Sequence, residues 1–405
     1  MPSVLRARWV LPITRPPIDG GWVEIGDGRI RAVGDGSRSG ATDLGDVVLL
    51  PALVNAHTHL ELSWMAGRVP PAVSMTDWIR TLLRVRRAGP AGGEPESLDA
   101  MRRAAAGMRA SGTALIGDIS NTLTSPPVLA EAGLGGVIFH ELIGFNALDP
   151  VGQVHEAWEK EKDVEGLLTK SAKRHPTFFS VVAHAPYSVS PALFMEIARR
   201  RREAPLAVHL GESPEEIEFL RTGRGPLRDT LEQLGVWSGE WPVPACDPVE
   251  YIHRMGYLQQ GLLAVHAVHL TDDALGRLRH AGAIVVTCPR SNVWAGVGLP
   301  RLSHFYATGV PVAIGTDSLA SAPTLNLFDE LEEIRRIAPD VSAASLLDSA
   351  TRQGALALGF GADFGSVEAG KRAALIAVPV PAGVTDVEEY LVSGVPPSAV
   401  RWAAD

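Results

Sequence analysis

The sequence predicts an α/β fold: a (β/α)8 TIM-like barrel with a small β-sandwich built from both ends of the chain. Two observations support this prediction. Short apolar runs alternate with amphipathic stretches through the middle of the chain, which is typical of repeated strand-helix units. Both ends instead have short strand-like runs broken by turns. We expect residues 1–50 and 359–405 to form the composite sandwich and residues 51–358 to form the barrel.

The two ends of the chain carry the signals for the sandwich. Residues 22–25 and 29–33 are strand-like, and Asp27-Gly28 lies between them, which is a strong hairpin signal. Near the other end, residues 365–371 form a glycine-bounded turn before the apolar run 373–378. Because both regions differ from the middle in the same way, we expect them to pack together.

The middle of the chain carries the signals for the barrel. Amphipathic stretches occur at residues 99–109, 191–201, 271–280 and 326–337. Catalytic groups of such barrels sit at the carboxyl ends of the strands. The longest irregular insertion, residues 222–260, is predicted to form a lid or a specificity wall. The apolar runs end near eight residues that can carry chemistry: His57, Asp118, His140, His184, His209, His266, Cys288 and Asp317.

Composition excludes several classes of partner. The net charge is −9 and the chain has no basic stripe, which argues against nucleic acid or an anionic membrane as the main partner. No segment approaches the ~20 apolar residues of a membrane span. Two cysteines and the absence of a leader-like start favour a cytoplasmic protein. We expect a small-molecule substrate, and the sequence leaves a homodimer open.

Three of the apolar runs end in residues that could bind a metal ion. His57 and His59 are two residues apart at a strand end, so both side chains can point the same way. His209 and Asp317 end two later runs. Each histidine alone could equally be a hydrogen-bonded core residue. Together, the four residues predict a site for a divalent ion, with zinc favoured and iron or manganese as alternatives.

These motifs resemble the amidohydrolase superfamily, and within it the branch of deaminases and chlorohydrolases that includes cytosine, guanine and S-adenosylhomocysteine deaminases. The resemblance covers nearly the whole chain. It rests on His57-Thr58-His59-Leu60-Glu61, His209-Leu210-Gly211-Glu212, His266-Ala267-Val268-His269-Leu270, Ser291-Asn292 and Gly315-Thr316-Asp317-Ser318.

The resemblance also bears on the number of metal ions. Two-metal members of the superfamily bridge their ions with a carboxylated lysine or a glutamate. This chain has no lysine from position 174 through 370, so we expect a single ion. Four lysines, Lys160, Lys162, Lys170 and Lys173, lie in a charged helix-like stretch and are expected to be solvated.

The resemblance implies roles for three residues. Glu212 would shuttle protons, His266 would orient the attacking hydroxide, and Asp317 would take a proton from the water. The local sequence agrees for Glu212, because Ser213-Pro214 is a good helix start and places Glu212 just ahead of the helix. Glu215 and Glu216 are better explained by the helix dipole. His269 is expected to be structural.

Further motifs look most like aminodeoxyfutalosine deaminases, which convert the adenine base of 6-amino-6-deoxyfutalosine to hypoxanthine during menaquinone biosynthesis. These motifs lie at residues 57–64, 142–146 and 316–321. The resemblance implies contacts to ribose hydroxyls and to a benzoate carboxylate. The candidates for these contacts are Glu61, His184 and an arginine among Arg80, Arg84 and Arg290.

Alternative roles remain open for several of these side chains. His184 could face the substrate or cap the following turn, and Arg290 could bind an anion or the barrel rim. Trp64 and Trp78 could stack on an aromatic base or belong to the core.

Alternative functions also remain open. They are an adenosine- or S-adenosylhomocysteine-type deaminase, a guanine deaminase and a triazine-type chlorohydrolase. Ala322-Pro323-Thr324 replaces an Asn-Asn-type turn of many branch members, so substrate contacts there could differ. A non-enzymatic interaction protein of this fold would have lost its metal ligands, and here all of them are present.

Overall fold

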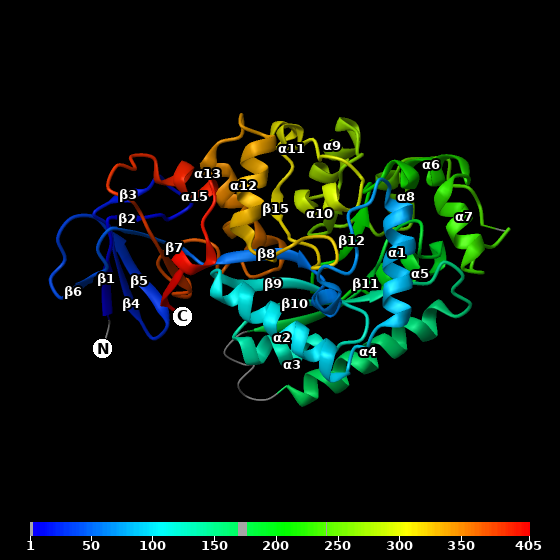
Figure 1. The fold of residues 1–405 in the computed structure, drawn as a ribbon, viewed down its shortest axis with the longest axis horizontal. Coiled ribbons are helices and arrows are strands. Elements are labelled where there is room, and N and C mark those ends of the chain that lie inside the picture. The colour runs from blue at the N-terminus through cyan, green and yellow to red at the C-terminus, as the bar shows by residue number, and fades with distance from the viewer. Residues whose placement is uncertain (1–2, 169–175, 240) are drawn as a thin grey trace.

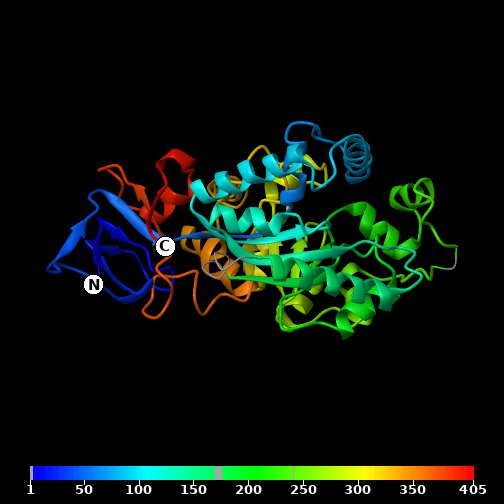
Figure 2. The same cartoon turned by 90° about the horizontal axis from the view of Figure 1, so that it is seen from below.

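The computed structural model describes residues 3–168, 176–239 and 241–405. The β-rich ends of the chain lie together at one end of the molecule, and the helices α6 and α7 lie at the other (Figures 1 and 2). Lys160 and Lys162 are exposed on α4, as expected, whereas Lys170 and Lys173 fall outside the described residues. Among the helices described, none is long and apolar enough to cross a membrane.

The predicted barrel is confirmed. Two four-stranded parallel sheets, ordered β11-β10-β9-β8 and β12-β13-β14-β15, form its wall. A parallel bridge between Thr58 and Asp317 joins β8 to the end of β15. The His209 amide donates to the His184 carbonyl at 2.9 Å and joins β11 to β12. The barrel strands are β8 (Leu53–Thr58), β9 (Thr113–Ser120), β10 (Gly135–Leu142), β11 (Thr177–Ala183), β12 (Ala207–Leu210), β13 (Leu263–His266), β14 (Ile284–Thr287) and β15 (Val312–Ile314).

Helices separate the barrel strands, and the predicted amphipathic stretches are among them. Ser190, Thr271 and Asn326 cap three of these helices, because each side chain accepts a backbone N–H of the first turn. The helices are α1 (Met75–Ala88), α2 (Pro95–Ala110), α3 (Ser125–Ala132), α4 (Pro150–Leu167), α5 (Pro191–Arg199), α6 (Pro214–Thr222), α7 (Pro226–Gln233), α8 (Pro248–Arg254), α9 (Asp272–His280), α10 (Pro289–Trp294), α11 (Leu302–Thr308), α12 (Leu327–Ile337), α13 (Ala343–Asp348) and α14 (Gly354–Ala357). Shorter helical turns are η1 (Leu60–Met65), the π-helical η3 (Ser349–Gln353) and η4 (Pro397–Ala399).

Both ends of the chain contribute to a pair of sheets, ordered β5-β4-β1-β6 and β17-β16-β7-β2-β3. Val23, Ile30, Leu49 and Leu375 share one buried cluster between them. The predicted hairpin is present, and its Asp27-Gly28 turn has φ values of 54° and 71°. The strands are β1 (Ser3–Arg6), β2 (Trp9–Val10), β3 (Ile18–Asp19), β4 (Trp22–Gly26), β5 (Arg29–Gly34), β6 (Ala41–Asp43), β7 (Val47–Pro51), β16 (Leu375–Pro379) and β17 (Arg401–Ala404).

Two expectations differ from the structure. The insertion at residues 222–260 holds α7 and α8, and each of these helices has a proline in its first turn. The carboxyl-terminal segment is not all β structure, because α15 (Val387–Val392) packs on α12 and α13 of the barrel. Val387 and Leu391 are buried on α15, so its apolar face explains this placement.

Candidate active site

A cavity of about 210 Å³ opens at the carboxyl ends of the barrel strands. Helices α1 and α7 provide much of its apolar wall, so the segment predicted as a lid does border the site. The histidines and carboxylates lining it come from six places in the fold. They are His59 after β8, Glu141 on β10, His184 after β11, His209 and Glu212 at β12, His266 on β13 and Asp317 after β15.

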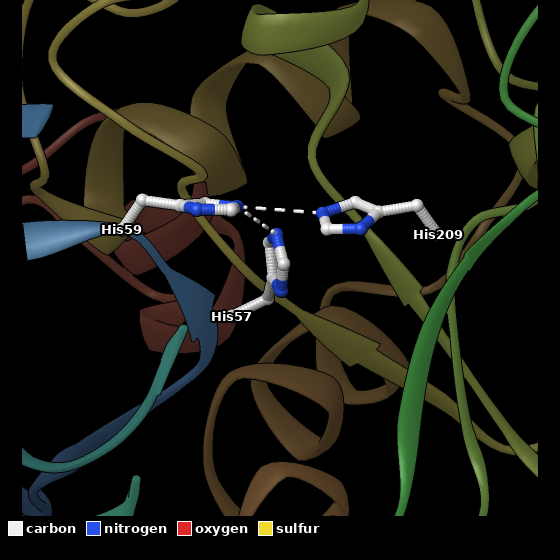
Figure 3. Close-up of side chains that lie close together, drawn as sticks. All are labelled: His57, His59 and His209. Carbon is white, nitrogen blue, oxygen red and sulfur yellow. Dashed lines mark hydrogen bonds between the residues drawn. The ribbon is translucent and has the colours of Figure 1, made fainter. Parts of the chain in front are cut away.

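Three imidazoles converge at the floor of this cavity (Figure 3). The Nε2 atom of His59 lies 3.2 Å from that of His57 and 3.3 Å from that of His209. Nitrogens held by one tetrahedral ion at ~2.0–2.1 Å would be about this far apart. The Nδ1 of His209 lies 3.1 Å from the His184 carbonyl, which fixes Nδ1 as the donor and leaves Nε2 free to bind a metal.

Asp317 completes this group. Its Oδ1 lies 3.5 Å from His59 Nε2 and 3.9 Å from His57 Nε2. Its other oxygen accepts hydrogen bonds from the hydroxyls of Ser291 and Ser321. Burial raises the pKa of Asp317, but the neighbouring histidines and the Ser291 hydrogen bond outweigh it, and the pKa lies below its usual value. The carboxylate is therefore ionised at neutral pH.

The protonation of the histidines suits a cation. Burial is the largest cause that lowers the pKa of His57, His59 and His209, and it lowers that of His59 to about 3 although Asp317 opposes the shift. All three rings are neutral near pH 7. Three neutral imidazoles and one carboxylate are a typical donor set for Zn²⁺ or a similar divalent ion, so these residues fit the predicted metal site.

Glu212 lies at the edge of this group, with Oε1 3.4 Å from His266 Nε2. Burial, followed by the charge of Asp317, raises its pKa well above the usual value, which favours the neutral acid. The Ser213 cap and the start of α6 at Pro214 are as predicted. Glu216 lies in the first turn of α6, where the helix dipole favours it, as expected. It is buried, and its carboxylate accepts the Gly211 and Glu212 amides at 3.0 Å each, which fixes the backbone of Glu212.

His266 is oriented by a neighbour that sequence reasoning did not assign. The side-chain amide of Asn292 lies 3.0 Å from His266 Nδ1, and with its nitrogen as the donor the ring proton is on Nε2, facing Glu212. His266 and Asp317 both have positive φ, 72° and 56°, a strained conformation that is frequent at functional sites. His269 lies outside the cavity with Nε2 2.8 Å from the Val297 carbonyl, a structural contact as expected.

Two of the residues proposed for substrate contact do line the cavity. The His184 ring lies 4.8 Å from that of His209, and its Nδ1 also contacts the Ser188 hydroxyl at 2.5 Å, so it faces the cavity and braces the following turn. Trp78 belongs to the wall formed by α1. Trp64 does not reach the cavity, because its ring packs closely against Gly89.

Three other residues expected at the substrate lie elsewhere. Glu61 is buried, and its carboxylate accepts hydrogen bonds from Ser120, Asn121 and Thr122, so its polar atoms are already used. Arg84 lines a separate surface groove between α1 and α7, which Arg80 also lines. Arg290 contacts Thr324 and lies 3.6 Å from the buried Glu330. Residues of nearby loops form hydrogen bonds with Glu61 and Arg290. The spacing of residues along the sequence does not reveal such contacts.

Sequence reasoning missed Glu141 and Arg86 in the cavity wall. Glu141 follows His140 on β10, so strand alternation points the two side chains in opposite directions. His140 faces away, 3.9 Å from Glu161 of α4, whereas Glu141 lies 3.5 Å from His209 Nδ1. Arg86 continues the helical spacing of the apolar residues that line the cavity from α1. Both signals were present in the sequence.

Sequence relatives of the chain include deaminases. It is 31% identical over 332 residues to the aminodeoxyfutalosine deaminase of Deinococcus radiodurans, covering 79% of this chain and 75% of that protein. It is 27% identical over 398 residues to a 5-methylthioadenosine/S-adenosylhomocysteine deaminase of Moorella thermoacetica, covering 91% of this chain and 83% of that protein.

Solved structures share the fold. Aminofutalosine deaminase of Helicobacter pylori in complex with methylthio-coformycin superposes with a TM-score of 0.82 at 24% identity, covering 96% of this chain and 95% of that one. A zinc-bound adenosine deaminase of Xanthomonas campestris gives a TM-score of 0.77 at 25% identity, covering 98% of this chain and 90% of that one. Residues 48–395, well over half of the sequence, match the amidohydrolase family. The chain therefore belongs to the amidohydrolase family and is a hydrolytic enzyme of its deaminase-containing branch.

Proposed function

We propose that this chain hydrolytically deaminates an aminopurine nucleoside, with 6-amino-6-deoxyfutalosine as the substrate and futalosine and ammonia as the products. The observation that supports this most directly is the placement of Glu212. Its carboxyl group, whose pKa is raised by burial, lies 3.4 Å from His266 and borders the same cavity as His59, His209 and Asp317. Deamination of a purine needs both an acid for the ring nitrogen and a source of hydroxide.

His57, His59, His209 and Asp317 would hold one divalent ion, and Zn²⁺ suits this donor set. Such an ion, when bound, makes hydroxide available near neutral pH by lowering the pKa of water towards ~7. A single ion is consistent with the residues around the group. No lysine lines the cavity among the described residues, and the nearby Glu141 faces the Nδ1 side of His209 rather than its Nε2 side.

The proton transfers follow from the protonation states of the side chains. The raised pKa of Glu212 favours its protonated form, which would donate to the ring nitrogen beside the carbon that carries the amino group and make that carbon electrophilic. Asp317 is ionised and accepts a proton from the attacking water. After water has added to the carbon, a proton moves to the exocyclic nitrogen and ammonia leaves. His266 holds its Nε2–H towards the addition site, because Asn292 fixes its ring.

A second candidate is deamination of 5-methylthioadenosine or S-adenosylhomocysteine. Several relatives at 27–29% identity carry that name, and the aligned region covers 71–83% of each of those proteins. The reacting base and the proton transfers are the same for these substrates, so the two candidates differ only in the part of the cavity remote from the metal site. Triazine hydrolases are similar in fold at 18–19% identity, which does not favour their reaction.

The test is ammonia release from aminodeoxyfutalosine, 5-methylthioadenosine, S-adenosylhomocysteine, adenosine and guanine by one metal-loaded preparation. We expect kcat/KM to be highest for aminodeoxyfutalosine. A higher value for 5-methylthioadenosine or S-adenosylhomocysteine would replace the first candidate with the second. Release from none of these compounds, by protein that holds its metal, would contradict deamination of aminopurines altogether.

A further inference from the structure

One face of α1 forms an apolar wall of the cavity and ends in a charge. Met75, Trp78, Ile79, Leu82 and Leu83 line the cavity at helical spacing, and Arg86 occupies the next position on that face. A residue at this position that only had to pack against the wall would be apolar. The sequence instead places a guanidinium where the apolar wall ends.

Among the described residues, no carboxylate oxygen lies within 4.0 Å of the Arg86 guanidinium, whereas Arg80 of α1 and Arg102 of α2 each have such an acidic partner. Its one assigned hydrogen bond is to the Asn121 side-chain oxygen, at 3.3 Å. It is also the only lysine or arginine among the described residues that line the cavity. A guanidinium at the border of an apolar pocket with unused donors is a ready binding group for an oxyanion.

The position of Arg86 within the cavity separates it from the acidic catalytic groups. Asn121, which follows β9, links Arg86 to Glu141 on β10 through a 3.0 Å hydrogen bond to the carboxylate. Glu212 and Asp317 come from β12 and β15, on the other half of the barrel wall. A negatively charged group of a bound molecule would be repelled by the Asp317 carboxylate and attracted to Arg86.

We propose that Arg86 is a specificity-determining residue that binds an oxyanion, a carboxylate or a phosphate, on the part of the substrate remote from the reacting base. This inference rests on the proposed function for the identity of the base. It goes further by predicting that the enzyme selects anionic over neutral nucleosides, and by assigning that selection to Arg86 rather than to Arg80, Arg84 or Arg290.

A neighbouring arginine provides a matched control. Arg87 is the next residue of α1 and is exposed, as Arg86 is, but it lines the surface groove between α1 and α7 together with Arg80 and Arg84 instead of the cavity. Arg87→Gln therefore removes the same charge from the same helix without touching the cavity. Any effect of net charge on the approach of anions should be equal in Arg86→Gln and Arg87→Gln.

The experiment compares both variants with the unmodified enzyme on aminodeoxyfutalosine, adenosine 5′-monophosphate and neutral adenosine. We expect Arg86→Gln to lower kcat/KM for the preferred anionic substrate about 10- to 100-fold, mainly through KM, as for loss of a charge-assisted hydrogen bond. Adenosine should be little affected, and Arg87→Gln should resemble the unmodified enzyme on all three. A larger loss of kcat/KM on aminodeoxyfutalosine would identify a carboxylate as the recognised group, and a larger loss on adenosine 5′-monophosphate would identify a phosphate.

An equal loss on adenosine would overturn the inference, because Arg86 would then bind ribose or support the pocket. So would unchanged kcat/KM for both anionic substrates in Arg86→Gln. Benzoate binding, measured by calorimetry, tests the inference without turnover. If the enzyme deaminates none of the three nucleosides yet binds benzoate at least tenfold more tightly than Arg86→Gln does, the proposed function fails and the anion site stands. Equal benzoate affinity of enzyme and variant would contradict the anion site.

Discussion

Polar residues lie at the ends of most barrel strands, and they fall into two groups with different roles. On β8, β12, β13 and β15, the strand ends place His57, His209, His266 and Asp317 around one point. On β9 and β10, the corresponding Asp118 and His140 do not enter the cavity. Asp118 accepts the Leu60 amide at 2.9 Å, which secures the chain just after His59.

This difference shows that a reactive residue at a strand end is not enough to identify a catalytic one. What separates the two groups is the direction of the side chain and what has already used its polar atoms. Glu61 illustrates the same point, because Ser120, Asn121 and Thr122 donate hydrogen bonds to its carboxylate. These residues hold the loop that positions His59 but leave nothing to bind a substrate. Replacing one residue of each kind should therefore have different consequences.

The largest expected effect is on a metal ligand. His209→Ala removes one of the three converging nitrogens, and activity should fall to the level of metal-depleted enzyme, together with the bound metal. Metal analysis and ammonia release from the same sample measure both. His140→Gln, at the end of β10, is the matched control and should keep metal and activity. Full activity in His209→Ala, or loss of metal in His140→Gln, would break the distinction between the two groups of strand ends.

The next largest effect is expected on kcat when Glu212, the proposed general acid, is replaced. Glu212→Gln should lower kcat about 10²- to 10⁴-fold, because it removes a general acid and keeps a similar shape. The bound metal should be unchanged, since Glu212 lies beside the ligand group and not among it. Glu215→Gln, three residues along the chain, controls for the loss of an acidic charge and should remain active. Loss of metal from Glu212→Gln would mean that Glu212 is a ligand.

A smaller effect, on stability alone, is expected at Asp118. Burial raises its pKa from 3.8 to about 7, so the folded protein holds this proton more tightly than the unfolded chain does. The resulting stabilisation is complete below about pH 4 and is lost as pH rises through about 7. Asp118→Asn should match the unmodified protein near pH 4 and exceed its free energy of unfolding by a few kcal/mol at pH 8. Denaturant unfolding at both values measures this, and a constant difference would contradict it.

The smallest effect on activity is expected at Arg290, which the sequence suggested as a substrate contact. Arg290 lies 3.6 Å from Glu330, and burial raises the pKa of Glu330 to about 8. Arg290→Gln should lower the free energy of unfolding by about 1–3 kcal/mol and leave KM unchanged. Arg84→Gln should change neither, because Arg84 is exposed and hydrogen-bonds to the Thr81 hydroxyl of its own helix. A raised KM in Arg290→Gln alone would restore its role at the substrate.

Much of the fold could be predicted because its signals are local. Alternating apolar runs, the Asp27-Gly28 hairpin and the helix start at Ser213-Pro214 each depend on a few neighbouring residues. The helices α7 and α8 were missed although Pro226 and Pro248 mark their first turns. The packing of α15 on the barrel depends on residues far away in the sequence, and no local pattern reveals it.

The candidate site likewise has a part that could be predicted from the sequence and a part that could not. The convergence of His57, His59 and His209 could be predicted because parallel strand ends meet at one rim of a barrel. The hydrogen bonds that occupy Glu61 and Arg290 could not, since they depend on the paths of loops. The helix dipole explained the position of Glu216, but its buried carboxylate also accepts the backbone amide of Glu212. Support residues of this kind are visible only once the loops are placed.

The central claim is that three histidines and Asp317 hold one ion, and that this ion acts together with Glu212 and His266 in deamination. Titrating metal-depleted enzyme with Zn²⁺ while following ammonia release from aminodeoxyfutalosine tests it most directly. We predict that activity is absent without metal, rises in proportion to added Zn²⁺ and levels off at one equivalent per chain. Activity that persists without metal, or that levels off only at two equivalents, would contradict this account of the site.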